Sequence, residues 1–148
     1  MSNKLITASN KETQKLGQLM AKEILKLDEE QLGAFLIALK GDLGSGKTTF
    51  TQGLALGFGV EEKINSPTFV IMKRFELKNL TFKNLYHLDC YRIEKPEDLL
   101  DLGWKEIIKD SKNIIVIEWP EKIQKLLPPE IFTINFKFIN ENQRGVSL

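Results

Sequence analysis

The spacing of apolar residues predicts a helix near the start of the chain and a strand followed by a helix after it. Leu16, Leu19, Met20, Ile24 and Leu27 recur every three or four residues, which is the spacing of an amphipathic helix. Ser9 with Glu12 fits a capping box at its start. Residues 32–40 form an apolar run of strand length, and residues 48–59 have helical apolar spacing that ends in glycines.

The second half of the chain continues to alternate between strand and helix patterns. Residues 64–77 and 80–91 contain many β-forming residues, and the short KN segment between them predicts a hairpin. Residues 96–108 read as helical turns opened by a proline, with a stop at Gly103. Residues 114–117 are four consecutive apolar β-branched residues, the pattern of a strand buried on both faces. A short helix over 121–127, stopped by Pro128, and a final strand over 131–139 complete the prediction.

Strands interleaved with helices predict an α/β fold with a largely parallel central sheet, flanking helices and some antiparallel strands. The length of 148 residues fits one domain, and the chain shows no repeat, low-complexity stretch or linker. We therefore expect a single domain over residues 1–148.

The motif with the clearest chemistry is GDLGSGKT at residues 41–48, a full match to the phosphate-loop pattern. Gly41 and Gly46 can adopt backbone angles that turn successive N–H groups toward phosphate oxygens. Lys47 adds positive charge near the β- and γ-phosphates, and the hydroxyl of Thr48 is suited to Mg²⁺. The required order of strand, loop and helix is present, so the sequence predicts the P-loop NTPase fold. The expected nucleotide-binding residues are Asp42, Leu43, Gly44, Ser45, Gly46, Lys47, Thr48 and Thr49.

Three further residues are candidates for metal binding or hydrolysis. Glu118 ends the most apolar strand, where phosphate-loop enzymes hold Mg²⁺; the alternative is a solvent-facing acid at a strand end. Asp89, in HLDCYR, could position the attacking water or share the metal shell, or it could pair with Arg92. Thr68, in SPTF, resembles the threonine with which nucleotide switches sense the γ-phosphate.

Other chemically distinctive residues are expected to be structural. His87, the only histidine, fits a packed or hydrogen-bonded residue better than a metal ligand, and one His with one Cys cannot form a zinc site. Trp104 and Trp119 fit core or rim positions, although Trp119 could cover the nucleotide. Cys90 has no identifiable base that would make it a nucleophile.

Composition excludes some partners and favours an intracellular location. The 21 basic and 20 acidic residues give a net charge of +1, so strong binding to RNA by this chain alone is not indicated. A single cysteine, the absence of a charged-then-apolar leader in MSNKLITASN and the absence of a long apolar stretch lead us to expect a cytoplasmic protein that does not enter membranes.

The order and separation of GDLGSGKTTFTQGLALGFG, SPTF, YHLDCYR and IEWPE resemble the TsaE (YjeE) family, small bacterial ATPases needed for threonylcarbamoyladenosine in tRNA. The similarity runs from about Thr7 to the end of the chain, where QRGVSL looks like the family's closing strand. The resemblance implies that residues 44–48 hold ATP phosphates and Mg²⁺, that Glu118 completes the metal shell and that Asp89 is required for hydrolysis. It raises Thr68 to a switch residue. It also implies that the protein binds the TsaB–TsaD heterodimer and uses ATP to reset that complex between turnovers.

Three other classes share part of this pattern. A small-molecule kinase would have the same loop, but it usually needs an arginine-rich lid, and this chain has only three arginines. A regulatory GTPase normally has an Asn-Lys-x-Asp segment, whereas the nearby string here is NKET, before the loop. The third class is a module that binds ATP without hydrolysing it, which Asp89 and Glu118 argue against.

Overall fold

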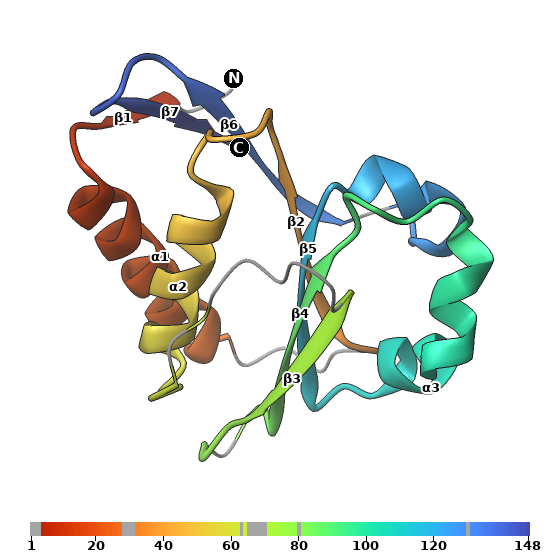
Figure 1. The fold of residues 1–148 in the computed structure, drawn as a ribbon. Helices are drawn as coiled ribbons and strands as arrows, with labels where there is room; N and C mark the ends of the chain where they lie inside the picture. Colours follow the sequence, from red (N-terminus) through yellow and green to blue (C-terminus); the bar gives the residue numbers. More distant parts are fainter. Residues whose placement is uncertain (1–3, 28–31, 63, 65–70, 80, 130) are drawn as a thin grey trace. The chain divides into compact units, whose positions relative to one another are not determined.

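The computed structural model describes residues 4–27, 32–62, 64, 71–79, 81–129 and 131–148. Its strands and helices, coloured along the sequence in Figure 1, are interleaved along the chain. They are β1 (Lys4–Thr7), α1 (Asn10–Leu25), β2 (Phe35–Lys40), α2 (Lys47–Gly57), β3 (Met72–Glu76), β4 (Asn84–Asp89), η1 (Pro96–Leu102), α3 (Trp104–Lys109), β5 (Asn113–Glu118), η2 (Pro120–Leu126), β6 (Phe132–Phe138) and β7 (Arg144–Ser147). The two η elements are 3₁₀ helices.

Hydrogen bonds link the strands in the order β1-β7-β6-β2-β5-β4-β3. The sheet is mixed: β4 and β5 are parallel, whereas β1 with β7, β6 with β7 and β3 with β4 are antiparallel. The predicted α/β fold class with some antiparallel strands is confirmed, but the sheet is mixed where a largely parallel one was expected, because β1, β7 and β3 pair antiparallel with their neighbours.

Contacts divide the chain into two compact units, with β2 passing from the second into the first. The first unit contains residues 1–27, 39–66 and 133–148, and the second contains residues 28–38 and 67–132. The expectation of one domain over 1–148 stays a prediction. Among the described residues, no helix is both long and apolar enough to cross a bilayer.

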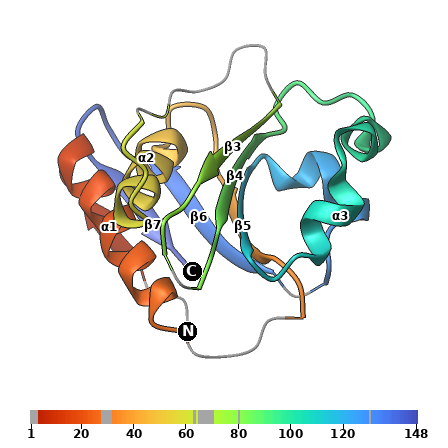
Figure 2. The ribbon, with the colours of Figure 1, turned by 90° about the horizontal axis from the view of Figure 1, so that it is seen from below.

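In the first unit, α1 and α2 lie side by side (Figure 2) because glycines let their backbones approach closely. A Cβ atom on Gly17 would collide with the carbonyl oxygen of Phe50, and one on Gly53 would collide with that of Gln14. Phe50 of α2 also packs edge-to-face on Phe136 of β6, with ring centroids 5.2 Å apart. These contacts fix α2, and with it the loop that precedes it.

We expect the substitution Gly53→Ala to destabilise the protein. Alanine favours a helix over glycine by about 1 kcal/mol, but the added methyl group has no room beside the backbone of Gln14. Overpacking of this kind costs about 1–3 kcal/mol or more, so the midpoint of urea unfolding should fall. Leu56→Ala is the matched control. Leu56 is on the same helix and is 46% exposed, so this substitution should change the midpoint little. A Gly53→Ala protein as stable as the wild type would contradict the close helix contact.

In the second unit, the apolar core surrounds β5, whose six residues are all buried. The predicted strand ending at Glu118 is therefore confirmed. Trp104 is a core residue, as expected: it is 2% exposed, and its indole N–H donates to the carbonyl of Leu126 at 3.3 Å. The core cluster consists of Leu36, Leu88, Cys90, Ile93, Leu99, Trp104, Ile115, Ile117 and Ile123.

Several elements differ from the prediction for local reasons. The strand predicted over 32–40 begins only at Phe35, because Gly33 packs against the carbonyl of Ile108 and Ala34 donates to that same oxygen. The helical segment predicted over 96–108 breaks at Gly103, which has φ +85°, as the predicted stop requires. The strand β1, four residues long, was not predicted.

The hairpin of β3 and β4 is confirmed, but the two strands are shorter than predicted and their connection is longer than KN. The side-chain oxygen of Asn79 accepts hydrogen bonds from the N–H groups of Thr81 and Phe82, which turns the chain there. The strand predicted from residue 64 falls partly on residues 65–70, outside the described residues.

Candidate nucleotide and metal site

The loop of residues 41–46 joins β2 to α2 in the first unit (Figure 1). Gly44 and Gly46 have positive φ values of +75° and +102°, a region that only glycine enters readily. Gly41 is needed for another reason: a Cβ atom there would lie 2.6 Å from the carbonyl oxygen of Phe136 and 2.7 Å from Ser45 Oγ. The three glycines of the motif thus have identifiable steric roles.

Two polar groups of the loop are withdrawn from solvent. Lys47, the first residue of α2, is 4% exposed, and its ammonium donates to the carbonyl oxygen of Gly41. Ser45 is 1% exposed, and its hydroxyl makes no hydrogen bond to any described residue. Gly46 caps α2 without a side-chain hydrogen bond, and the first turn of the helix contains no acidic residue. Such a helix start, with an unsatisfied hydroxyl and a lysine, is suited to an anion.

Side chains from two segments distant in the sequence lie next to Gly46. A Cβ atom on Gly46 would lie 3.4 Å from Cγ of Arg144, in β7, and 3.6 Å from Cγ2 of Thr13, in α1. The hydroxyl of Thr13 is bonded to that of Thr7 at 2.6 Å, and both residues are buried. The side chains of Thr13 and Arg144 therefore flank the loop within the first unit.

The start of α1 is held by the predicted cap. Ser9 Oγ accepts a hydrogen bond from the N–H of Glu12 at 3.1 Å. The carboxylate of Glu12 accepts a hydrogen bond from the N–H of Ala8. A capping box would use the N–H of Ser9, one residue later. This capping role accounts for Ser9 and Glu12 without a ligand.

The two candidate acids end adjacent strands in the second unit. Asp89 ends β4, Glu118 ends β5, and the parallel register pairs them directly. Asp89 Oδ1 accepts a hydrogen bond from the N–H of Tyr91 at 3.1 Å, an Asx turn that fixes the carboxylate at the strand end. The register therefore brings the two acids together at the carboxyl ends of β4 and β5.

Glu118 is a buried acid and not the solvent-facing acid of the alternative interpretation. It is 3% exposed, and its Oε2 lies 2.5 Å from Nε2 of His87, which is 1% exposed. His87 is thus the hydrogen-bonded residue that the sequence predicted, but its partner was not foreseen. The contact follows from the β4–β5 register, which places His87 opposite Val116.

Two aromatic side chains follow the acids along the chain. Trp119 has φ +60° and ψ +53°, the only positive φ of a non-glycine residue among those described. Its ring packs on that of Tyr91, with centroids 5.0 Å apart. The left-handed conformation makes the chain leave β5 immediately after Glu118. Trp119 therefore lies just beyond the carboxyl end of β5.

Cys90 lies beside the acids but is not a nucleophile. Burial raises the pKa of its thiol to about 12, and the negative charges of Asp89, Glu118 and Glu121 add to the rise. At neutral pH the side chain is therefore a neutral thiol, which agrees with its expected structural role.

The candidate residues thus fall into two groups. Residues 42–49 lie in the first unit, and Asp89 and Glu118 lie in the second. Thr68 lies outside the described residues.

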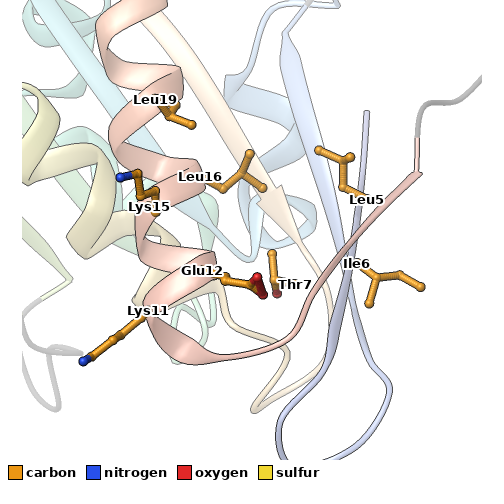
Figure 3. A pocket seen from close by; sticks show the side chains of 8 residues that line it. All are labelled: Leu5, Ile6, Thr7, Lys11, Glu12, Lys15, Leu16 and Leu19. Atoms are coloured by element: carbon orange, nitrogen blue, oxygen red, sulfur yellow. The ribbon is translucent and has the colours of Figure 1, made fainter.

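A separate groove of about 460 Å³ lies between β1 and α1 in the first unit (Figure 3). Leu5 and Leu16 point toward one another across it, whereas Lys11 points away. None of residues 41–48 lines this groove.

The strand–loop–helix motif in a mixed seven-stranded sheet defines an α/β protein with a P-loop NTPase-like fold. Residues 7–146 match the family model "Threonylcarbamoyl adenosine biosynthesis protein TsaE". The chain belongs to the TsaE family, as its motifs predicted.

Relatives and a solved structure agree with this assignment. A tRNA threonylcarbamoyladenosine biosynthesis protein TsaE from Rickettsia felis is 36% identical over 145 residues, covering 97% of this chain and 78% of the relative. The protein of the same name from Bacillus subtilis is 38% identical over 112 residues, covering 76% of this chain and 67% of the relative. The crystal structure of YdiB from Bacillus subtilis has a TM-score of 0.71 and 29% identity, covering 99% of this chain and 84% of that one. The family takes part in the biosynthesis of threonylcarbamoyladenosine in tRNA.

Proposed function

We propose that this chain is a Mg²⁺-dependent ATPase that acts with a TsaB–TsaD heterodimer in threonylcarbamoyladenosine modification of tRNA. ATP binding and hydrolysis reset that complex between turnovers. The observation that carries the proposal is the loop of residues 41–48, with positive φ at its glycines and buried Lys47 at the start of α2.

The loop fits the phosphates of ATP. Gly44 and Gly46 have positive φ, the backbone conformation from which anion-binding turns are built. The unsatisfied Ser45 hydroxyl supplies another donor, and a phosphate oxygen is a stronger partner for the Lys47 ammonium than the carbonyl of Gly41. Residues 42–49 thereby bind and orient the triphosphate, and Thr13 and Arg144, beside Gly46, are candidate contacts to the nucleoside.

Two oxygen donors fit Mg²⁺, which prefers hydroxyl and carboxylate oxygens. Thr48 offers its hydroxyl in the first turn of α2, and Glu118 offers a carboxylate at the end of β5. Glu118 is 3% exposed, and its place at the carboxyl end of a buried parallel strand is where such sites gather their ligands. When bound, the ion neutralises charge on the phosphates.

Asp89 orients the attacking water for hydrolysis. Its carboxylate is held by the N–H of Tyr91 beside the end of β5, so it is positioned before ATP binds. Thr68 has the proposed role of sensing the γ-phosphate.

The partner complex supplies what this chain lacks for rapid hydrolysis. The chain has only Arg74, Arg92 and Arg144, and none of them is assigned as the arginine that stabilises the transition state. Stabilisation of the transition state by an arginine is worth about 10³–10⁵ in rate. With a net charge of +1, the chain alone is not expected to bind tRNA strongly.

The test is phosphate release from Mg-ATP by the full chain with and without purified TsaB–TsaD. We expect slow release by the chain alone and much faster release with the heterodimer. The Lys47→Ala chain with the same heterodimer measures the background. Equal rates with and without TsaB–TsaD would overturn the proposal that the partners complete the site.

A further inference from the structure

The buried contact between His87 and Glu118 points to a role for His87 in the metal site. Its Nε2 lies 2.5 Å from Glu118 Oε2, and the side chains of the two residues are 2% and 3% exposed. A contact this short between buried polar groups fixes both side chains. Because a carboxylate can only accept a hydrogen bond, an ionised Glu118 requires the proton to be on Nε2.

The position of His87 in the sheet makes this contact a fixed part of the fold. His87 is on β4, two residues before Asp89, and β4 pairs in parallel with β5, which carries Glu118. The imidazole thus reaches across to the last residue of the neighbouring strand. The main chain supports the same arrangement, since the N–H of Cys90 donates to the carbonyl of Glu118 at 3.0 Å.

We propose that His87 is a positioning residue that holds the Glu118 carboxylate in the orientation that binds Mg²⁺. The inference rests on the proposed function of Glu118 and adds a residue to it. His87 does not contact the metal. Its N–H engages one carboxylate oxygen and so limits rotation of the acid, in the way that partners of metal ligands generally do.

The experiment measures the Mg²⁺ dependence of ADP binding by calorimetry, over a series of Mg²⁺ concentrations. His87→Leu keeps a buried apolar side chain but removes the donor, and we expect the Mg²⁺ concentration needed for half of the enhancement to rise about 10–100-fold. His87→Gln offers an amide N–H in place of the imidazole donor and should recover most of the loss. ADP affinity in EDTA should be the same for all three proteins.

The matched control is Leu85→Ala, which truncates a fully buried residue on the same strand and two residues before His87. This variant should lower thermal stability while leaving the Mg²⁺ dependence of the wild type. If it shifts the Mg²⁺ dependence as much as His87→Leu does, the effect reflects general loosening of β4, and the inference is overturned.

A measurement on the wild type decides the question even if His87→Leu does not fold. His87 is the only histidine in the chain, so its imidazole ¹H–¹⁵N signals are assigned without mutagenesis. We expect Nε2 to be protonated and its signal to shift when Mg²⁺ is added to the ADP complex. No shift, or an unchanged Mg²⁺ dependence in His87→Leu, would overturn the role of His87 alone. If the ADP affinity of the wild type does not depend on Mg²⁺, the proposed function of Glu118 is overturned as well.

Discussion

Replacing Lys47 with alanine is expected to abolish tight ATP binding. A hydrogen bond to a charged group contributes about 1.5–3 kcal/mol, which corresponds to about a 10- to 150-fold rise in Kd. The true loss should lie at or above the upper end, because Lys47 is only 4% exposed and its interaction with phosphate is poorly screened by water. Calorimetric titration with Mg-ATP measures this directly.

Lys40→Ala is the matched control for this substitution. Lys40 ends β2, immediately before the loop, and its side chain is exposed. Its replacement by alanine removes a positive charge near the loop without changing residues 41–48. Its ATP affinity should remain close to that of the wild type. An unchanged affinity in Lys47→Ala would refute the phosphate-binding assignment of the loop.

Asp89→Ala is expected to leave ATP binding largely intact while lowering the rate of hydrolysis. General acid–base and water-positioning groups contribute about 10²–10⁴-fold to rate, and the loss should appear in the chemical step. Single-turnover assays with the TsaB–TsaD complex present separate that step from binding and product release.

Two further variants separate the proposed role of the Asp89 carboxylate in hydrolysis from its structural role as acceptor for the N–H of Tyr91. Asp89→Asn keeps an oxygen that can accept from the N–H of Tyr91 but removes the charge, so it should be nearly as slow as Asp89→Ala. Asp110→Ala removes an equivalent turn, in which Oδ1 accepts from the N–H of Lys112 at 2.9 Å, and should hydrolyse ATP normally. If Asp89→Asn were as active as the wild type, Asp89 would have only a structural role.

The sequence predicted the elements whose signals are local. The apolar run before Glu118, the spacing of α1 with its Ser9 cap and the glycine pattern of the loop depend on neighbouring residues alone, and the structure has these features in place. The strand β1 was missed because three of its four residues are exposed, so it shows no alternation of buried and exposed positions. It is a strand because it pairs with β7, and such pairing leaves no mark in a single short segment.

The same distinction holds for the candidate site. Glycines, lysine and acids are recognisable by type and spacing, so residues 42–49, Asp89 and Glu118 could be proposed from the sequence. The contact of His87 with Glu118 and the approach of Arg144 to Gly46 could not, because they depend on strand register and on the return of the chain end. A register is set by the packing of whole strands, and a shift of one residue would turn His87 to the other face.

The pairing of β1 with β7 has a consequence for how the protein acquires its structure during synthesis. Lys4 is paired with Ser147, so the unit that carries the phosphate loop joins strands that are far apart in the sequence. The other unit uses only residues 28–38 and 67–132, and all of these leave the ribosome before residues 133–148 of the first unit. Contacts between residues far apart in sequence form late. The nascent chain can therefore assemble the strands bearing Asp89 and Glu118 first, and the unit around the loop of residues 41–46 is completed only after β7 has been synthesised.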